Sequence, residues 1–278
     1  MNAARTAGLT LVETLISMAL SAVVVGAILN FSSQSITSSA QSGSLAQQQQ
    51  ELLNAQQLIT GKLREAYYLY PANHTLALST TNDPVVRNPI TGTNTWQNGN
   101  APMLAMILPP SQPQVTCAAS TNGCYRFHAY YATRRGTWIS GVNATPWRNP
   151  GPDGPNDNVW VIAEYRAFMP NSFTTTVTAP GFTYPGTPPA VPTGGSSNIL
   201  ADLIAPGVVT SGLVTSSGTY TMFTLTTGTV SGVSAATGVT MNLATMSRIN
   251  RKVIRQPSDT DEFTVTVTPE NLGKRTVY

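Results

Sequence analysis

Charged side chains are scarce in this sequence. Lys, Arg, Asp and Glu make up 10% of the 278 residues, against about 25% in ordinary soluble domains. This scarcity is untypical of a cytosolic enzyme, while a 41% hydrophobic content and 20 prolines argue against a protein with many membrane spans. The formal net charge of +3 is too small to indicate nucleic acid or anionic lipid as a partner of the whole surface.

Histidine and cysteine are also rare, with two of each. His74 and His128 have no obvious Cys or carboxylate partner in the sequence and are predicted to be ordinary surface or strand residues. Residues 152–158 carry carboxylates and amides but lack EF-hand spacing, so a turn-rich loop is expected there rather than a calcium site. The G-x-S-x-G, H-E-x-x-H and P-loop patterns are absent. We therefore expect no metal, no cofactor and no catalysis.

One long apolar run lies close to the N-terminus, over residues 9–31, and Glu13 is its only charge. Such a run is long enough to span a bilayer. Arg5 is the only charged residue before it, and the positive-inside bias then keeps the start of the chain in the cytoplasm. The sequence predicts a single span, with residues 32–278 outside.

The residues at the start of this run, Gly8-Leu9-Thr10-Leu11-Val12-Glu13, resemble the prepilin signature of type IV pilins and type II secretion pseudopilins. The resemblance implies a leader of residues 1–8, cleavage after Gly8 by a prepilin peptidase and N-methylation of Leu9. A carboxylate one turn into a membrane span needs a partner charge. Glu13 is expected to neutralise the freed amino group of Leu9 in a neighbouring pilin subunit. The alternatives are a Glu13 at headgroup level and an uncleaved signal anchor.

Residues 32–70 are polar and Gln-rich but carry an apolar stripe at helical spacing. Pro71 ends the pattern. The sequence predicts that this amphipathic segment continues the membrane helix of residues 9–31 into the head, although a Gln run is also compatible with a flexible linker. The residues of the stripe are Leu45, Leu52, Ala55, Ile59, Leu63 and Ala66.

Beyond Pro71 the hydrophobic pattern changes to short β-branched or alternating runs, which predict a β-rich head over residues 71–278. The expected fold class is α+β and type IV pilin-like, with the long helix packed on this head. Long loops are expected at 136–158 and 171–198. The predicted strands are 103–108, 125–133, 159–168, 219–226, 239–243 and 262–268.

The order of four segments in the head resembles the strand succession of PilW-like minor pilins and their secretion counterparts. These segments are residues 125–131, 199–208, 239–243 and 263–271. Heads of that family commonly close with a basic residue followed by Asn, whereas this chain has Glu270-Asn271.

Cys117 and Cys124 flank an Asn-Gly pair in the part of the chain expected outside the membrane. Thiols there are readily oxidised, and Asn-Gly favours a tight turn that brings the two ends together. A disulfide is expected. A metal pair would need further ligands, and a redox site would need C-x-x-C spacing.

The densest positive region comprises Arg248, Arg251, Lys252 and Arg255. Such a cluster is a candidate for binding DNA phosphates or another anion. The alternatives are a solvated loop and a contact with an acidic neighbouring subunit, and the stretch has no aromatic residues for stacking single strands.

These features together predict a minor type IV pilin, a structural subunit that enters or primes a pilus at low copy, for DNA uptake, adhesion or twitching. Its expected partners are the prepilin peptidase, other pilin subunits, the bacterial inner membrane before assembly and, through the basic cluster, DNA. The expected final location is the pilus, the cell surface or the periplasm. The alternatives are a DNA- or ligand-binding tip protein and a type II secretion pseudopilin.

Overall fold

The computed structural model describes residues 10–81, 85–99, 102–110, 125–142, 148–178, 184–207, 220–249 and 252–274. The chain divides into two compact units, Met1–Gln47 and Gln48–Tyr278. A long helix, α1 (Leu11–Glu65), contributes to both units. The remaining described elements form a β-rich second unit, so the α+β layout expected from the sequence is confirmed.

The described part of the first unit is helix alone. Its side chains are exposed from Thr10 to Ala40. Gly26, the one residue in this stretch that could interrupt a helix, lies inside α1 without a break. The continuous helix agrees with the predicted joining of residues 9–31 to the segment that follows.

The C-terminal part of α1 belongs to the second unit and buries one face. The predicted apolar stripe is buried from Leu52 to Ala66, while Leu45 is half-buried. The helix ends at Glu65 rather than at Tyr70, because Tyr68 and Leu69 pair with the sheet as a short strand. Pro71 therefore follows a strand and is not the residue that stops the helix.

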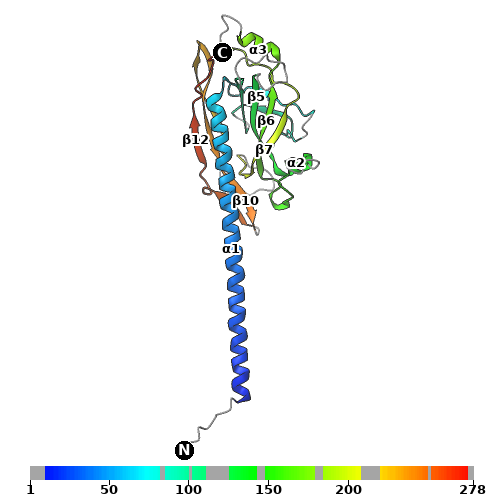
Figure 1. Ribbon diagram of the computed structural model, residues 1–278, viewed down its shortest axis with the longest axis vertical. Coiled ribbons are helices and arrows are strands. Elements are labelled where there is room, and N and C mark those ends of the chain that lie inside the picture. Colours follow the sequence, from blue (N-terminus) through cyan, green and yellow to red (C-terminus); the bar gives the residue numbers. More distant parts are fainter. Residues whose placement is uncertain are drawn as a thin grey trace, which may run out of the picture. The chain divides into compact units, whose positions relative to one another are not determined.

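The largest sheet has seven antiparallel strands in the order β1-β4-β5-β6-β7-β10-β11. Figure 1 shows β5, β6 and β7 side by side. The bounds are β1 (Tyr68–Leu69), β4 (Met103–Leu108), β5 (Arg126–Arg134), β6 (Trp160–Phe168), β7 (Ser196–Ile204), β10 (Thr245–Ile249) and β11 (Lys252–Gln256).

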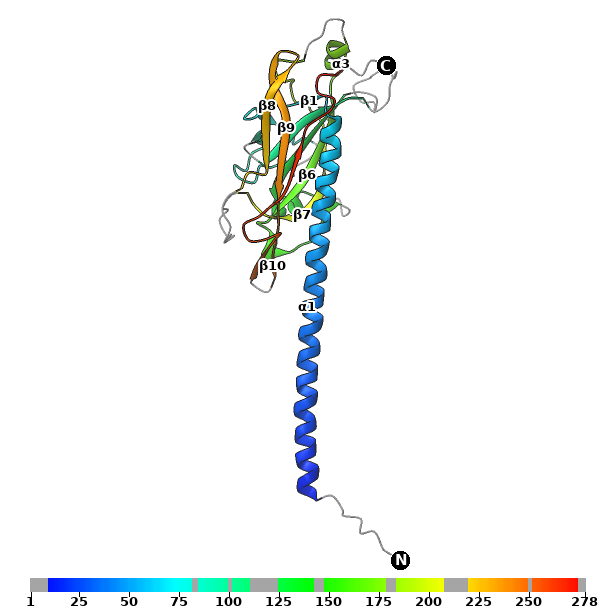
Figure 2. The ribbon, with the colours of Figure 1, turned by 90° about the vertical axis from the view of Figure 1, so that its left-hand side faces the viewer.

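A second sheet has three strands in the order β12-β9-β8, visible beside the end of α1 in Figure 2. Its strands are β8 (Phe223–Val230), β9 (Val233–Leu243) and β12 (Phe263–Val267). A two-stranded sheet pairs β2 (Thr75–Ala77) with β3 (Thr95–Gln97). Three short helices complete the described elements: α2 (Arg135–Gly141), the 3₁₀ helix η2 (Gly154–Asn156) and α3 (Asn171–Thr178).

The head has separate cores on the two faces of the seven-stranded sheet. On one face, Leu52, Ile59 and Leu63 of α1 pack with alternate residues of β4, β5 and β6 and with β9 of the three-stranded sheet. On the other face, Phe127, Tyr131 and their neighbours pack against the two-stranded sheet and α2. The alternation of side chains along each strand assigns successive residues to opposite cores.

Four predicted strands agree with the structure to within one residue at each end: 103–108, 125–133, 159–168 and 262–268. The predicted strand 239–243 is the end of the longer β9, and 219–226 is displaced to Phe223–Val230. The predicted loops 136–158 and 171–198 contain α2, η2, α3 and the start of β7.

Candidate functional site

The first described turn of α1 is closed by a reciprocal pair of residues. The backbone N–H and Oγ1 of Thr10 donate to Oε2 of Glu13 at 2.9 and 3.0 Å, and the N–H of Glu13 donates to Thr10 Oγ1 at 3.3 Å. This is a capping box, in which two side chains satisfy backbone groups that a helix start leaves unpaired. Among the described residues, nothing donates to the second carboxylate oxygen, Oε1.

Large apolar side chains surround the helix after this cap. Leu11, Met18, Val23, Leu29 and Phe31 each expose more than half of their surface. By length and composition, α1 contains a segment apolar enough to cross a membrane, and none of that segment is buried by the rest of the protein. The segment is compatible with a membrane anchor or with a signal sequence.

Several predicted site residues lie outside the described part of the chain. They are Gly8 and Leu9 of the cleavage signature, Cys117 and Cys124 of the expected disulfide, and Arg251 of the basic cluster.

The described members of the basic cluster do not share one surface. Arg248 lies on β10 opposite Val253, and Arg255 lies on β11 opposite Met246. Because side chains alternate along a strand, these two residues occupy one face of the hairpin and Lys252 the other. Lys252 is exposed and Arg248 is half-buried.

Arg255 is turned into the protein. Its side chain is 2% exposed, and Nη2 donates to Glu262 Oε1 at 2.6 Å. Nη1 donates to the carbonyls of Ser258 and Asp261 at 2.7 and 2.5 Å, and the guanidinium lies 5.6 Å from the ring centre of Tyr220. These contacts tie β11 to the segment before β12, so Arg255 holds the fold together rather than facing an external phosphate.

His128 is not an isolated strand residue, contrary to the expectation from the sequence. It is 3% exposed on β5, and its Nδ1 lies 2.9 Å from Oε1 of Glu164 on β6. Tyr130 donates its hydroxyl to the same oxygen at 3.0 Å, and Nε of Arg166 lies 3.2 Å from Oε2. The sequence analysis missed this cluster because His128 and Glu164 are 36 residues apart in the chain. The available signal was the presence of polar residues at alternate positions of two otherwise apolar strands.

The protonation of this cluster follows from its burial. Burial lowers the pKa of His128, against the opposing effect of its bond to Glu164. Burial acts to raise the pKa of Glu164, but the bonds and charges of His128, Arg166 and Tyr130 outweigh it and lower that pKa below its ordinary value. At neutral pH Glu164 is a carboxylate and His128 is neutral, with its Nδ1–H donated to Glu164.

The expected turn-rich loop at 152–158 contains η2, and its side chains are used internally. Asn156 donates to Asp153 Oδ2 at 2.8 Å and accepts from the backbone N–H of Arg248 at 2.7 Å. Within the described ranges, no group of three or more His, Cys, Asp or Glu side chains is placed to hold a metal ion.

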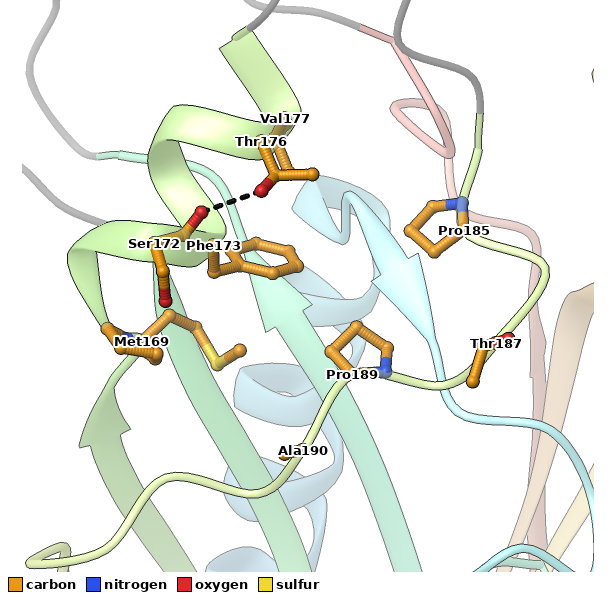
Figure 3. Close-up of a pocket in the computed structure, with 10 residues that line it drawn as sticks. Met169, Ser172, Phe173, Thr176, Val177, Pro185, Thr187, Pro189 and Ala190 are labelled. Atoms are coloured by element: carbon orange, nitrogen blue, oxygen red, sulfur yellow. Dashed lines mark hydrogen bonds between the residues drawn. The ribbon is translucent and has the colours of Figure 1, made fainter.

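An apolar cavity of about 330 Å³ lies between α3 and the prolyl segment that follows it (Figure 3). Phe173, Met169, Pro185 and Pro189 line it, and Thr176 Oγ1 donates to the carbonyl of Ser172 at its edge. None of its described lining residues is charged.

Comparison with known proteins adds no assignment: no family model, no curated protein and no solved structure matches the chain.

Proposed function

We propose that this chain is a minor type IV pilin, a non-catalytic subunit held in a membrane by α1 and then assembled into a filament through the same helix. One observation carries the proposal. Within the single helix Leu11–Glu65, the residues from Leu11 to Phe31 expose apolar side chains, whereas Leu52, Ile59 and Leu63 are buried in the head. The exposed apolar part needs lipid or other helices around it.

The start of α1 supports an assembly step. In the separate chain, Thr10 occupies only Oε2 of Glu13. Among the described residues nothing occupies the other carboxylate oxygen, and the amino group freed by cleavage after Gly8 is a cation that can pair with it. A buried carboxylate in lipid is costly without such a partner. The capping bonds thus hold the carboxylate at the helix start, ready for a neighbouring subunit.

The proposal includes a low copy number. The head comprises three sheets in addition to the end of α1, which is more than a filament repeat requires. We expect the protein to initiate assembly or to lie near the tip. Its share of sheared filament mass tests this point, because a major subunit forms most of that mass.

The decisive experiment is intact-mass and N-terminal analysis of the protein from cells with and without an active prepilin peptidase. The proposal requires a chain that starts at N-methylated Leu9 only when the peptidase is active. A chain that still starts at Met1, or one cut after residue 31, contradicts it.

A type II secretion pseudopilin is the closest alternative, because both classes use the same N-terminal device. Cell fractionation separates the two. A pilin appears in sheared surface filaments, whereas a pseudopilin remains with the cell envelope and its loss blocks protein export.

A further inference from the structure

On the helix-facing side of the seven-stranded sheet, a polar band lies beside the apolar core. Tyr130, Ile162 and Trp160 belong to the core beneath α1, and the positions two and four residues away along β5 and β6 are on the same face. Those positions carry Arg126, His128, Glu164 and Arg166. Ser196 of β7, paired with Arg166, extends the band to a third strand.

This band borders a cavity of about 460 Å³. Its size lies within the range of about 300–1,000 Å³ typical of small-molecule sites. Three strands and α1 supply its walls. The residues that line it are Leu58, Lys62, Arg126, His128, Glu164, Arg166, Ala167, Phe168, Gly194 and Ser196.

The charges of the cavity are predominantly positive. Lys62, Arg126 and Arg166 line it with a single carboxylate, Glu164. That carboxylate is already matched, because it accepts from His128 and Tyr130 and pairs with Arg166. Among the described residues, Lys62 pairs with the exposed Glu65, at 3.4 Å.

Most N–H groups of the Arg126 guanidinium have no hydrogen-bond acceptor among the described residues. Its only bond among the described residues is a 3.4 Å contact from Nη2 to the carbonyl of Pro109. Its Nε is buried and has no partner within the described ranges. A buried guanidinium donor without an acceptor is unfavourable, and an anionic oxygen is the acceptor that a guanidinium binds best.

His128 supplies a second unpaired group. Its Nδ1 is bound to Glu164, and Nε2 is buried without a partner among the described residues. Because the neutral ring donates from Nδ1, Nε2 is an acceptor. Nε2 is covered by protein atoms, so the cations, and not this acceptor, are the groups that a ligand in the cavity meets.

We propose that this cavity binds a small anion, with its carboxylate or phosphate held by Arg126 and Lys62. The site is independent of pilus assembly, since all its residues belong to the unit that starts at Gln48.

The test is isothermal titration calorimetry of the full chain in detergent micelles with four probes. Gluconate and glucose 6-phosphate offer a carboxylate and a phosphate beside hydroxyls, glucose lacks the anion, and inorganic phosphate lacks a sugar hydroxyl. We expect one of the two hydroxylated anions to bind, and the one that binds identifies the anionic group. Glucose, which has no anionic group, is expected to bind at least about tenfold more weakly.

The informative variant is Arg126→Gln, which leaves the bonds of Glu164 in place. Its matched control is Arg134→Gln at the other end of β5, where the guanidinium also donates to a proline carbonyl, in this case from Nε to Pro89 at 3.0 Å. We expect Arg126→Gln to weaken binding about tenfold or more and Arg134→Gln to leave it unchanged.

Three results overturn the proposal: no binding of either hydroxylated anion, equal binding of glucose, or an equal loss in the two variants. Binding of inorganic phosphate as tight as that of glucose 6-phosphate shows that the phosphate group alone supplies the affinity, as a site formed by cations requires. Circular dichroism of each variant confirms that the affinities refer to folded protein.

Discussion

Glu270 donates its backbone N–H to the carbonyl oxygen of Arg64, at 3.1 Å, in the last turn of α1. Gly273 donates in the same way to the carbonyl of Tyr67 at 2.9 Å. A helix leaves its last four carbonyls without an internal partner. A segment from the far end of the chain therefore completes the end of α1, which joins the helix to β12.

Ending the chain after Thr268 removes both of these donors. We expect the head to lose about 1–3 kcal/mol of unfolding free energy, because the carbonyls of Arg64 and Tyr67 lose their partners. Urea unfolding followed by circular dichroism measures the change. A chain that ends after Lys274 keeps both donors and should unfold like the full protein. Equal midpoints for the two truncations would show that the contact adds no stability.

Because Arg255 is paired inside the protein, we expect its replacement to reduce the stability of the head rather than its binding of a ligand. Arg255→Ala leaves Glu262 and the carbonyls of Ser258 and Asp261 without their donor in a buried setting. We expect a destabilisation of about 3 kcal/mol. Lys252→Ala is the control, since an exposed side chain of the same hairpin should change stability by less than about 0.5 kcal/mol.

The same pair of variants tests the DNA-binding alternative. If Arg255→Ala weakened binding of the folded protein to DNA and reduced its salt dependence, while stability stayed unchanged, the inward orientation of Arg255 would be wrong.

The sequence predicted elements that short-range patterns determine. The apolar stripe from Leu52 to Ala66 follows helical spacing and is buried as expected. The strand Met103–Leu108 is a continuous apolar run and is buried throughout. In both cases the hydrophobic pattern alone decides which face is covered.

The missed elements depend on distant partners. No strand was predicted in the region of β10 and β11, where the alternatives to anion binding were a solvated loop and a contact with an acidic neighbouring subunit. Pairing with β7 and burial of Met246 make the segment a hairpin. The turn between β8 and β9 could have been predicted from its Ser-Gly pair. Ser231 and Gly232 both have positive φ, as a two-residue hairpin turn requires.

The charged cluster of His128 could be predicted only in part. Alternation placed His128 on the same strand face as Arg126, but the pairing of β5 with β6 sets Glu164 beside it. Strand register depends on packing of the whole sheet, which one strand does not encode. The capping box of Thr10 and Glu13 was readable, because Thr-x-x-Glu before an apolar run is its signature.

The lowered pKa of His128 predicts a loss of stability in acid. The unfolded histidine has an ordinary pKa of 6.5 and the folded one a lower pKa, so the unfolded state binds more protons between these values. Stability is greatest above 6.5 and falls as pH drops through the folded pKa. The groups that set this pKa are Glu164, Arg126 and Arg166, with Tyr130 and Lys62 also facing the cluster.

Urea midpoints at about pH 7.5, 6.5 and 5.5 measure this dependence. We expect His128→Gln to remove most of the decline over that interval. His74→Gln is the matched control, because His74 is the other histidine and packs outside the cluster, on Tyr70 at 5.9 Å. If the decline persisted in His128→Gln and vanished in His74→Gln, His74 rather than His128 would cause the pH dependence, and the prediction would be wrong.

Below about pH 4.5, a further loss is expected from Glu164. Its folded pKa lies below the ordinary value of 4.5, so the stability that its ionised form contributes is present above 4.5 and is lost as pH falls through the folded pKa. The two losses occur in successive pH intervals. Because His128 contributes to the lowered pKa of Glu164, a His128 variant should remove the first loss and reduce the second.

Variants of Thr10 and Glu13 can show whether the proposed assembly depends on the charge of Glu13 or on the helix cap that the two residues form. Thr10→Ala removes the cap, which should cost the helix start about 1 kcal/mol, but keeps the carboxylate. Glu13→Gln keeps an acceptor for Thr10, since Gln also forms capping boxes, but removes the charge. Assembly through an amino group requires the charge. We therefore expect Glu13→Gln to reduce incorporation into sheared filaments about tenfold or more, and Thr10→Ala to preserve it.

Immunoblots of the filament and membrane fractions measure incorporation, and the mass of the membrane form verifies that both variants are cleaved after Gly8. If Thr10→Ala abolished incorporation while Glu13→Gln assembled normally, the helix cap rather than the charge would be what assembly requires. Glu13 would then be a capping residue of its own chain, and the paired amino group would have to be sought elsewhere.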